Sequence, residues 1–265
     1  MTVSHSAASP MPTIRQVGFD APWGWLAAGW RDLWRAPQIS LLYGAAFAFA
    51  AFVLLFGLTQ FGWQALVLAL AGGFLLVGPM LAVGLYEASR RLGSGEAIHF
   101  KDIVLVGVKS PGQLAFLGVI LMLAYFVWLE IAFLLFMLFF GQTGLPPAQD
   151  FVATLLFTGR GLGLLVIGST AGAALAATVF TISAVSVPLL MVERIDVVSA
   201  IVTSFKAVAQ NAGAMVLWAV LIAALIAVGV ATAFVGLVIT FPLVGHATWH
   251  AFTELVEREG TSAAD

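Results

Sequence analysis

The chain has 265 residues, of which 62% are hydrophobic and only 9% are charged, and its mean hydropathy is +1.06. Soluble domains carry about 25% charged residues, so this composition predicts an integral membrane protein and excludes a water-soluble one. The formal net charge of -2 argues against nucleic-acid binding, and the absence of cysteine excludes disulfides, thiolate metal sites and cysteine nucleophiles.

The N-terminal segment, residues 1–20, is polar and has no basic-then-apolar signal-peptide pattern. Pro10 and Pro12 disfavour a helix there, so we expect a disordered tail. A second short tail is expected at residues 259–265. Between them, residues 21–258 are predicted to form a single transmembrane domain.

The first helix is predicted within Pro22–Leu42 and ends at Pro37. Its apolar residues recur at i, i+3, i+4 and i+7, which gives one face of a helix. This face consists of Trp23, Leu26, Ala27, Trp30, Leu33 and Trp34, whereas Arg31, Asp32 and Arg35 lie off it. A helix with Trp on one side and Arg on the other is typical of the membrane interface, so we expect Trp23, Trp30, Trp34, Arg31 and Arg35 to be interfacial anchors.

A spanning helix needs about 20 apolar residues, and six stretches fit this length. These predicted spans are Ile39–Leu58, Ala65–Tyr86, Gly112–Phe140, Gly161–Met191, a span from Ala212 to a hairpin near Gly229–Ala233, and roughly Thr232–Leu255. Two further surface helices are expected at Phe100–Lys109 and Val197–Gln210, and a loop at Gly141–Asp150. The alternative for the last run is one span followed by a helix on the far surface.

An internal repeat favours six spans. Trp30–Pro37 aligns with Phe205–Ala212, and Pro79–Glu87 aligns with Pro242–His250. We therefore expect three parallel copies of one unit, covering approximately residues 22–92, 98–194 and 196–258. The predicted fold is an all-α integral membrane protein with six transmembrane helices as three hairpins, each preceded by an amphipathic interfacial helix.

The distribution of Lys and Arg predicts the orientation. In the six-span arrangement one side carries Arg15, Arg31, Arg35, Arg90, Arg91, Lys101, Lys109, Arg194, Lys206 and Arg258. The other side carries Arg160 alone. By the positive-inside rule, both termini and all three surface helices are expected to be cytoplasmic.

Several stretches resemble the domain of unknown function 2189 family of bacterial multi-pass membrane proteins. They are GWRDLWRAPQISLLYG (29–44), GPMLAVGLYEASRRL (78–92), PGQLAFLGV (111–119), residues 199–218 and PLVGHATWHAF (242–252). The resemblance implies a protein of the bacterial inner membrane with several spans. The family has no established activity, so the resemblance transfers no functional residue.

Glu130 is the main candidate for chemistry inside the membrane, because it lies well within the third predicted span. An intramembrane carboxylate usually faces the bundle interior and has a partner. We expect hydroxyl partners such as Thr178, Thr181 or Ser183. Two interpretations remain open, a proton or cation relay and a hydrogen-bonded structural glutamate.

A second polar cluster is predicted where the second and sixth spans reach the cytoplasm. His246 and His250 share a helix face at i, i+4, and Glu87 occupies the repeat position of His250, close to Arg90 and Arg91. The histidine pair alone is weak as a metal site because it has no carboxylate to orient it, so we predict no metal and no cofactor. The alternative is a set of interfacial residues bonded to backbone and lipid head groups.

Three functions are weighed. The favoured one is a non-catalytic accessory, scaffold or assembly subunit that packs against a larger membrane complex, such as a respiratory or photosynthetic one. The alternative is a transporter or channel for a small solute, ion or lipid that uses Glu130. An enzyme ranks third, because the sequence contains no phosphate loop, hydrolase triad or dinucleotide fingerprint. The expected partners are the lipid bilayer and its anionic head groups.

Overall fold

The computed structural model describes residues 12–63, 65–142, 146 and 148–257. These residues are almost entirely helical. The elements are β1 (Thr13–Ile14), α1 (Ala21–Arg35), α2 (Pro37–Gln60), α3 (Ala65–Leu81), α4 (Val83–Ser94), α5 (Phe100–Val104), α6 (Pro111–Phe140), α7 (Ala148–Phe157), α8 (Gly159–Ser183), α9 (Ser186–Val192), α10 (Val197–Gln210), α11 (Ala212–Ala231), α12 (Leu237–Leu255) and β2 (Val256–Glu257).

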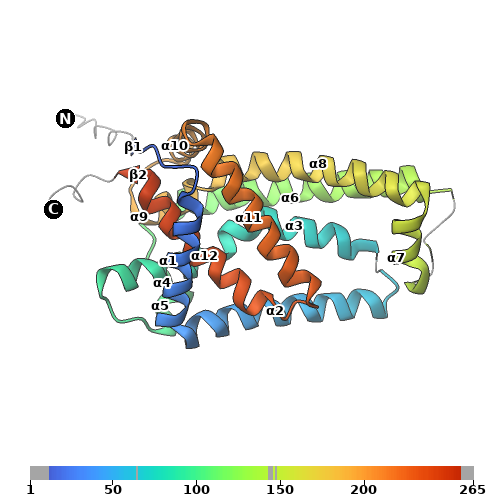
Figure 1. Ribbon diagram of the computed structural model, residues 1–265, viewed down its shortest axis with the longest axis horizontal. Helices are drawn as coiled ribbons and strands as arrows, with labels where there is room; N and C mark the ends of the chain where they lie inside the picture. Colours follow the sequence, from blue (N-terminus) through green and yellow to red (C-terminus); the bar gives the residue numbers. More distant parts are fainter. Residues whose placement is uncertain (1–11, 64, 143–145, 147, 258–265) are drawn as a thin grey trace, which may run out of the picture.

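The long helices α2, α3, α6 and α8 run side by side along the long axis of the molecule, and α1 crosses one end of them (Figure 1). Within the described residues, five helices are long and apolar enough to cross a membrane. They are Pro37–Gln60, Ala69–Ser94, Pro111–Phe140, Gly159–Val192 and Ala212–Ala231. The all-α, multi-pass membrane fold is therefore confirmed. The predicted sixth span corresponds to α12, which is not among these five.

Helix α12 forms the centre of the packing, since it contacts α1, α2, α4 and α11. The contacts with α1 and α2 rely on glycine. A Cβ at Gly29 of α1 would lie 2.6 Å from the backbone N of Ala247, and one at Gly44 of α2 would lie 2.8 Å from Cγ of Pro242. Because α12 is enclosed by neighbouring helices, it accommodates polar residues that a lipid-facing helix would exclude.

The two ends of the described chain meet beside α10. Strand β1 pairs antiparallel with β2, and Arg15 N donates to Leu255 O at 2.9 Å. The Asn211 side chain accepts from Val17 N at 2.9 Å and donates to Arg15 O at 3.0 Å. The predicted disordered tail is therefore wrong for residues 12–20, because the backbone of this segment finds hydrogen-bond partners far along the chain. Residues 1–11 and 259–265 lie outside the described residues.

Two of the predicted spans are broken near their prolines. The second consists of α3, which contains Pro79, and α4, with the break at Ala82. The fourth consists of α8 and α9, with the break just before Pro188. A proline ring removes a backbone donor and crowds the preceding turn, which accounts for the break before Pro188. The break at Ala82 follows Pro79 and is not explained in this way.

A predicted surface helix and a predicted loop are both shorter in the structure than the sequence indicated. The surface helix expected over Phe100–Lys109 ends at Val104, because the chain then runs along α9, where Lys109 N donates to Met191 O at 2.9 Å. The loop expected at Gly141–Asp150 is shorter than predicted, since α7 begins at Ala148. Helix α7 lies across the end of the bundle opposite α1 (Figure 1).

Candidate functional site

Helix α1 buries a face different from the predicted one. Trp25, Gly29 and Asp32 are buried together with Leu33, and of these four only Leu33 belongs to the predicted apolar face. Asp32 is only 3% exposed, although the sequence placed it with the arginines off the apolar face. The helix is amphipathic as expected, but a carboxylate points into the protein.

The carboxylate of Asp32 meets a histidine of α12. Oδ2 of Asp32 lies 2.7 Å from Nε2 of His250, and Oδ1 lies 3.8 Å from Nη1 of the exposed Arg35. Burial raises the pKa of Asp32, but hydrogen bonds from His250 and Ser89 outweigh it, so the pKa lies below its ordinary value. The carboxylate that sequence reasoning could not find for the histidine pair is therefore supplied by α1.

His246 lies one turn before His250 and is completely buried. Its Nε2 is 2.9 Å from the hydroxyl of Ser40 on α2, and its Nδ1 is 2.7 Å from the hydroxyl of Ser89 on α4. A neutral imidazole has one donor and one acceptor nitrogen, and a hydroxyl serves either role. Both ring nitrogens are thus satisfied without a charge.

Ser89 also lies near Asp32, where it contributes to lowering the pKa of that carboxyl, so the two histidine sites adjoin and form one polar network. Its members are Ser40, His246, Ser89, Asp32 and His250, and they come from α2, α12, α4 and α1. The side chain of His250 is 31% exposed at one end, while Ser40 is fully buried at the other. A serine beside an imidazole resembles a nucleophile and its base, but substrate has no access to a fully buried hydroxyl. The arrangement instead ties α1 to the bundle.

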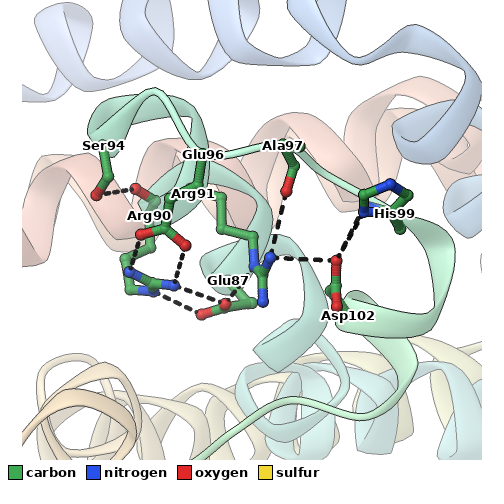
Figure 2. A network of polar contacts seen from close by, with 8 residues as sticks. All are labelled: Glu87, Arg90, Arg91, Ser94, Glu96, Ala97, His99 and Asp102. Atoms are coloured by element: carbon green, nitrogen blue, oxygen red, sulfur yellow. Dashed lines mark hydrogen bonds and ion pairs between the residues drawn. The ribbon is translucent and has the colours of Figure 1, made fainter.

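A second network surrounds Glu87 on α4 (Figure 2). Its carboxylate is 5% exposed and accepts from Nε of Arg90 at 2.7 Å and from Nε of Arg91 at 2.7 Å. Arg90 also binds Glu96 at 3.0 Å, and Arg91 binds Asp102 at 3.1 Å. The hydrogen bond from Arg90 lowers the pKa of Glu96. Both guanidinium groups are occupied by carboxylates, so this network fastens the α4–α5 loop.

The predicted polar cluster therefore separates into two. Glu87, Arg90 and Arg91 come together as expected, but His246 and His250 belong to the network of Asp32. Sequence reasoning missed Asp32, Ser40 and Ser89 as members. The signal for Asp32 was its spacing of three and seven residues from Gly29 and Trp25, which puts all three on one helical face. Among the described residues, no group of His, Cys, Asp and Glu side chains is placed to hold a metal ion.

Glu130 does not face the bundle interior, so that expectation was wrong. Its side chain is exposed on the outer surface of α6. The expected hydroxyl partners donate instead to carbonyls of their own helix: Thr178 to Ala174, Thr181 to Ala177 and Ser183 to Val179. The cause is that α6 is apolar on every side, so its sequence does not indicate which side is buried.

The predicted interfacial anchors lie on the outside of α1. Trp23 is 57% exposed, Trp30 46% and Trp34 50%, and the rings of Trp30 and Trp34 make an edge contact with centroids 5.6 Å apart. Arg31 and Arg35 are also exposed, next to the tryptophans. This outer surface is available to a membrane interface.

Residues 66–192 match the family model for predicted integral membrane proteins of the domain of unknown function 2189 family. The match confirms the resemblance and contains the stretches 78–92 and 111–119. The stretches 29–44, 199–218 and 242–252 lie outside the matched residues. No curated protein and no solved structure matches the chain.

Proposed function

We propose that this chain is a non-catalytic subunit of the bacterial inner membrane, an accessory, scaffold or assembly protein that packs against a larger membrane complex. The observation that carries the proposal is the outward position of Glu130 on α6. A carboxylate on a lipid-facing surface is costly unless it is paired, and a helix of another protein would supply the partner.

The surroundings of Glu130 make lipid a poor environment for it. The exposed residues one turn to either side are apolar: Phe126 (55% exposed), Val127 (51%), Phe133 (57%) and Leu134 (63%). About ten further residues of α6, roughly 15 Å of helix, separate Glu130 from the end at Phe140. A charged carboxylate at such a position costs about 2.5–3.5 kcal/mol on insertion scales. Within the described residues, no hydrogen bond or ion pair offsets this cost.

The partner is a transmembrane helix that presents a hydrogen-bond donor or a cation to this face of α6. An Arg, Lys, His or Ser at matching depth provides this chemistry. Respiratory and photosynthetic complexes are candidates, because they consist of many such helices in the same membrane. The rest of the face supplies exposed apolar surface for packing.

The alternative, transport through a path that uses Glu130, requires a polar cavity that converges on this carboxylate. An outward-facing Glu130 favours docking over that alternative. The two also differ in their response to mutation, because a proton or cation relay needs an ionisable group at this position, whereas a docking contact needs only a hydrogen bond.

Six spans with cytoplasmic termini form part of the proposal. Four elements that carry cations, α1, the end of α4, α5 and α10, lie at one end of the bundle (Figure 1). The start of α8, which contains Arg160, lies at the other end. The positive-inside rule assigns the first end to the cytoplasm. Helix α12 then returns the chain to this end, where β2 pairs with β1.

The threefold repeat is supported by a recurring backbone geometry. Ala36, Ser110 and Asn211 occupy equivalent places in the proposed copies, each directly before an outgoing helix. Their φ angles are -129°, -126° and -121°, and their ψ angles are 58°, 65° and 35°. Similar junctions at aligned positions favour a common origin over a chance alignment of apolar helices.

The test is purification of the tagged protein from its native membrane in mild detergent, followed by mass spectrometry. We expect a stoichiometric partner with the wild type and with Glu130→Gln, which keeps a hydrogen-bonding side chain. Glu130→Leu should weaken the association because the partner's polar group is left unpaired. Met122→Leu is the matched control, since Met122 is an exposed residue two turns earlier on α6. A partnerless wild type, or full recovery with Glu130→Leu, contradicts the proposal.

A further inference from the structure

The three surface helices at one end of the molecule share an unusual pairing. An exposed aromatic residue is followed directly by an exposed cation, and we call these the aromatic–cation pairs. They are Trp30–Arg31 and Trp34–Arg35 on α1, Phe100–Lys101 on α5, and Phe205–Lys206 on α10. The aromatic members are between 46% and 59% exposed.

Helices α1 and α10 present their exposed residues in the same register. Each has an outward stripe at i, i+4, i+7 and i+11, with cations beside its second half. The stripes are Trp23, Ala27, Trp30 and Trp34 on α1, and Val198, Val202, Phe205 and Ala209 on α10. Helices α1 and α10, which align in the proposed repeat, thus both expose an apolar stripe flanked by positive charge, which is the pattern of a helix lying in a membrane interface.

The opposite end of the molecule carries aromatic residues with little charge. Phe61 is 75% exposed, Trp63 58% and Phe157 83%. The cation at that end of the described chain is Arg160, at the start of α8. Aromatic belts mark both membrane interfaces, so the two ends differ in charge rather than in apolar character.

We propose that the aromatic–cation pairs form a binding surface for anionic phospholipids, confined to the leaflet at the α1, α5 and α10 end. The aromatic rings lie at the boundary between acyl chains and head groups, and the neighbouring cations donate hydrogen bonds to phosphate oxygens. The carboxylates nearby leave most of these charges free. Within the described residues Arg31, Lys101 and Lys206 form no ion pair, and Asp102 is engaged by Arg91. Arg35 alone pairs with a carboxylate, at 3.8 Å from the buried Asp32.

The test is a lipid titration of the purified protein in neutral detergent, followed by thermal unfolding. Dioleoyl phosphatidylglycerol is the anionic probe and dioleoyl phosphatidylcholine the zwitterionic one. We expect the wild type to be stabilised at lower concentrations of the anionic lipid. The combined variant Arg31→Gln, Arg35→Gln, Lys101→Gln and Lys206→Gln should lose this preference, with the half-saturating concentration rising about fivefold per cation removed.

Two variants control for unspecific charge effects. Lys109→Gln removes an exposed cation at the same end that does not follow an aromatic residue, and Arg160→Gln removes the cation at the other end. Both should keep the wild-type preference. The proposal is overturned if Lys109→Gln or Arg160→Gln reduces the preference for the anionic lipid as much as the combined variant does. It is also overturned if the combined variant keeps the preference. An equal stabilisation by inorganic phosphate overturns it too, since the ligand is then not a lipid.

Because the four cations are exposed, the combined variant should fold, and its unfolding temperature in phosphatidylcholine checks this directly. If it does not fold, the single variants Lys101→Gln and Lys206→Gln replace it. Each should raise the half-saturating concentration of phosphatidylglycerol alone, and an unchanged value for both overturns the proposal.

Discussion

Nε2 of His250 lies 2.7 Å from Oδ2 of Asp32, which joins α12 to a residue 218 positions earlier in α1. This contact is the outer end of the polar network that also contains Ser89, His246 and Ser40. It explains how a short amphipathic helix stays fixed across the end of the bundle. The same contact determines which side of α1 is left for the membrane interface.

Asp32→Asn should destabilise the protein because an amide is a weaker acceptor for the imidazole and Asp32 is only 3% exposed. Loss of a buried hydrogen bond of this kind costs about 1–3 kcal/mol. The measurement is thermal unfolding in detergent. Asp20→Asn is the control, since Asp20 is exposed just before α1 and makes no side-chain cap. Equal effects of the two substitutions would count against a structural role for Asp32.

The contribution of Asp32 should depend on pH in the acid range. Its pKa in the folded protein is lowered, since the hydrogen bonds from His250 and Ser89 outweigh burial. Stability from a lowered carboxyl pKa is complete above the unfolded value and disappears as the pH falls through the folded value. The difference in unfolding temperature between wild type and Asp32→Asn should therefore shrink as the pH falls below about 4. A difference that grows below this pH contradicts the stabilising role of the ionised carboxylate.

Ser89→Ala should be more damaging than a serine-to-alanine change usually is. Ser89 is 1% exposed and its hydroxyl lies 2.7 Å from Nδ1 of the fully buried His246, so its removal leaves a buried ring nitrogen without a partner. We expect a loss of about 1–3 kcal/mol in unfolding free energy. Ser94→Ala on the same helix is the comparison, since that exposed hydroxyl donates to Arg90 O. A similar loss of unfolding free energy in Ser89→Ala and Ser94→Ala would mean that the contact of Ser89 with His246 contributes little.

Glu87→Gln should loosen the segment between α4 and α5. The carboxylate of Glu87 pairs with two guanidinium groups at 2.7 Å, and a neutral amide cannot replace it. The expected result is faster amide hydrogen exchange in residues 95–105, measured by mass spectrometry. Glu96→Gln should have a smaller effect, since the side chain of Glu96 is 43% exposed and Arg90 keeps Glu87 as a partner. Unchanged amide exchange in Glu87→Gln would mean that the ion pairs of Glu87 do not hold this segment.

The positions of the helices could be predicted from the sequence, but their contact faces mostly could not. The outgoing helices α2, α6 and α11 begin within two residues of their predicted starts, because proline or polar residues precede long apolar runs. Within these runs every side is apolar, so no periodicity distinguishes lipid from protein neighbours. Glu130 was accordingly assigned to the wrong side of α6.

Contacts between distant segments could not be predicted either. The partnership of Asp32 with His250, and the pairing of β1 with β2, depend on where α12 returns, which no local pattern encodes. For α1 the sequence predicted an amphipathic helix but not which tryptophans are buried. Trp25 packs inside the protein, whereas Trp30 and Trp34 are exposed.

Single cysteines should test the path of the last two helices, because the native chain has none. If α11 and α12 form a transmembrane hairpin, a cysteine at Val235, which is 71% exposed in the connecting turn, should be labelled from the same side as one at Gly62. Cysteines at Ser94 and Thr261 should be labelled from the other side. Measurement with a membrane-impermeant maleimide on intact spheroplasts and on inverted vesicles distinguishes the sides.

The alternative, in which α12 is a helix on the far surface, predicts that Thr261 is labelled together with Gly62. That result would separate the C-terminal end of α12 from α1 and would break the contact between His250 and Asp32 as well as the pairing of β1 with β2. Labelling of Thr261 together with Ser94 requires the chain to return. In that case an enclosed helix with two histidines crosses the membrane, because its polar groups are satisfied by α1, α2 and α4 rather than exposed to lipid.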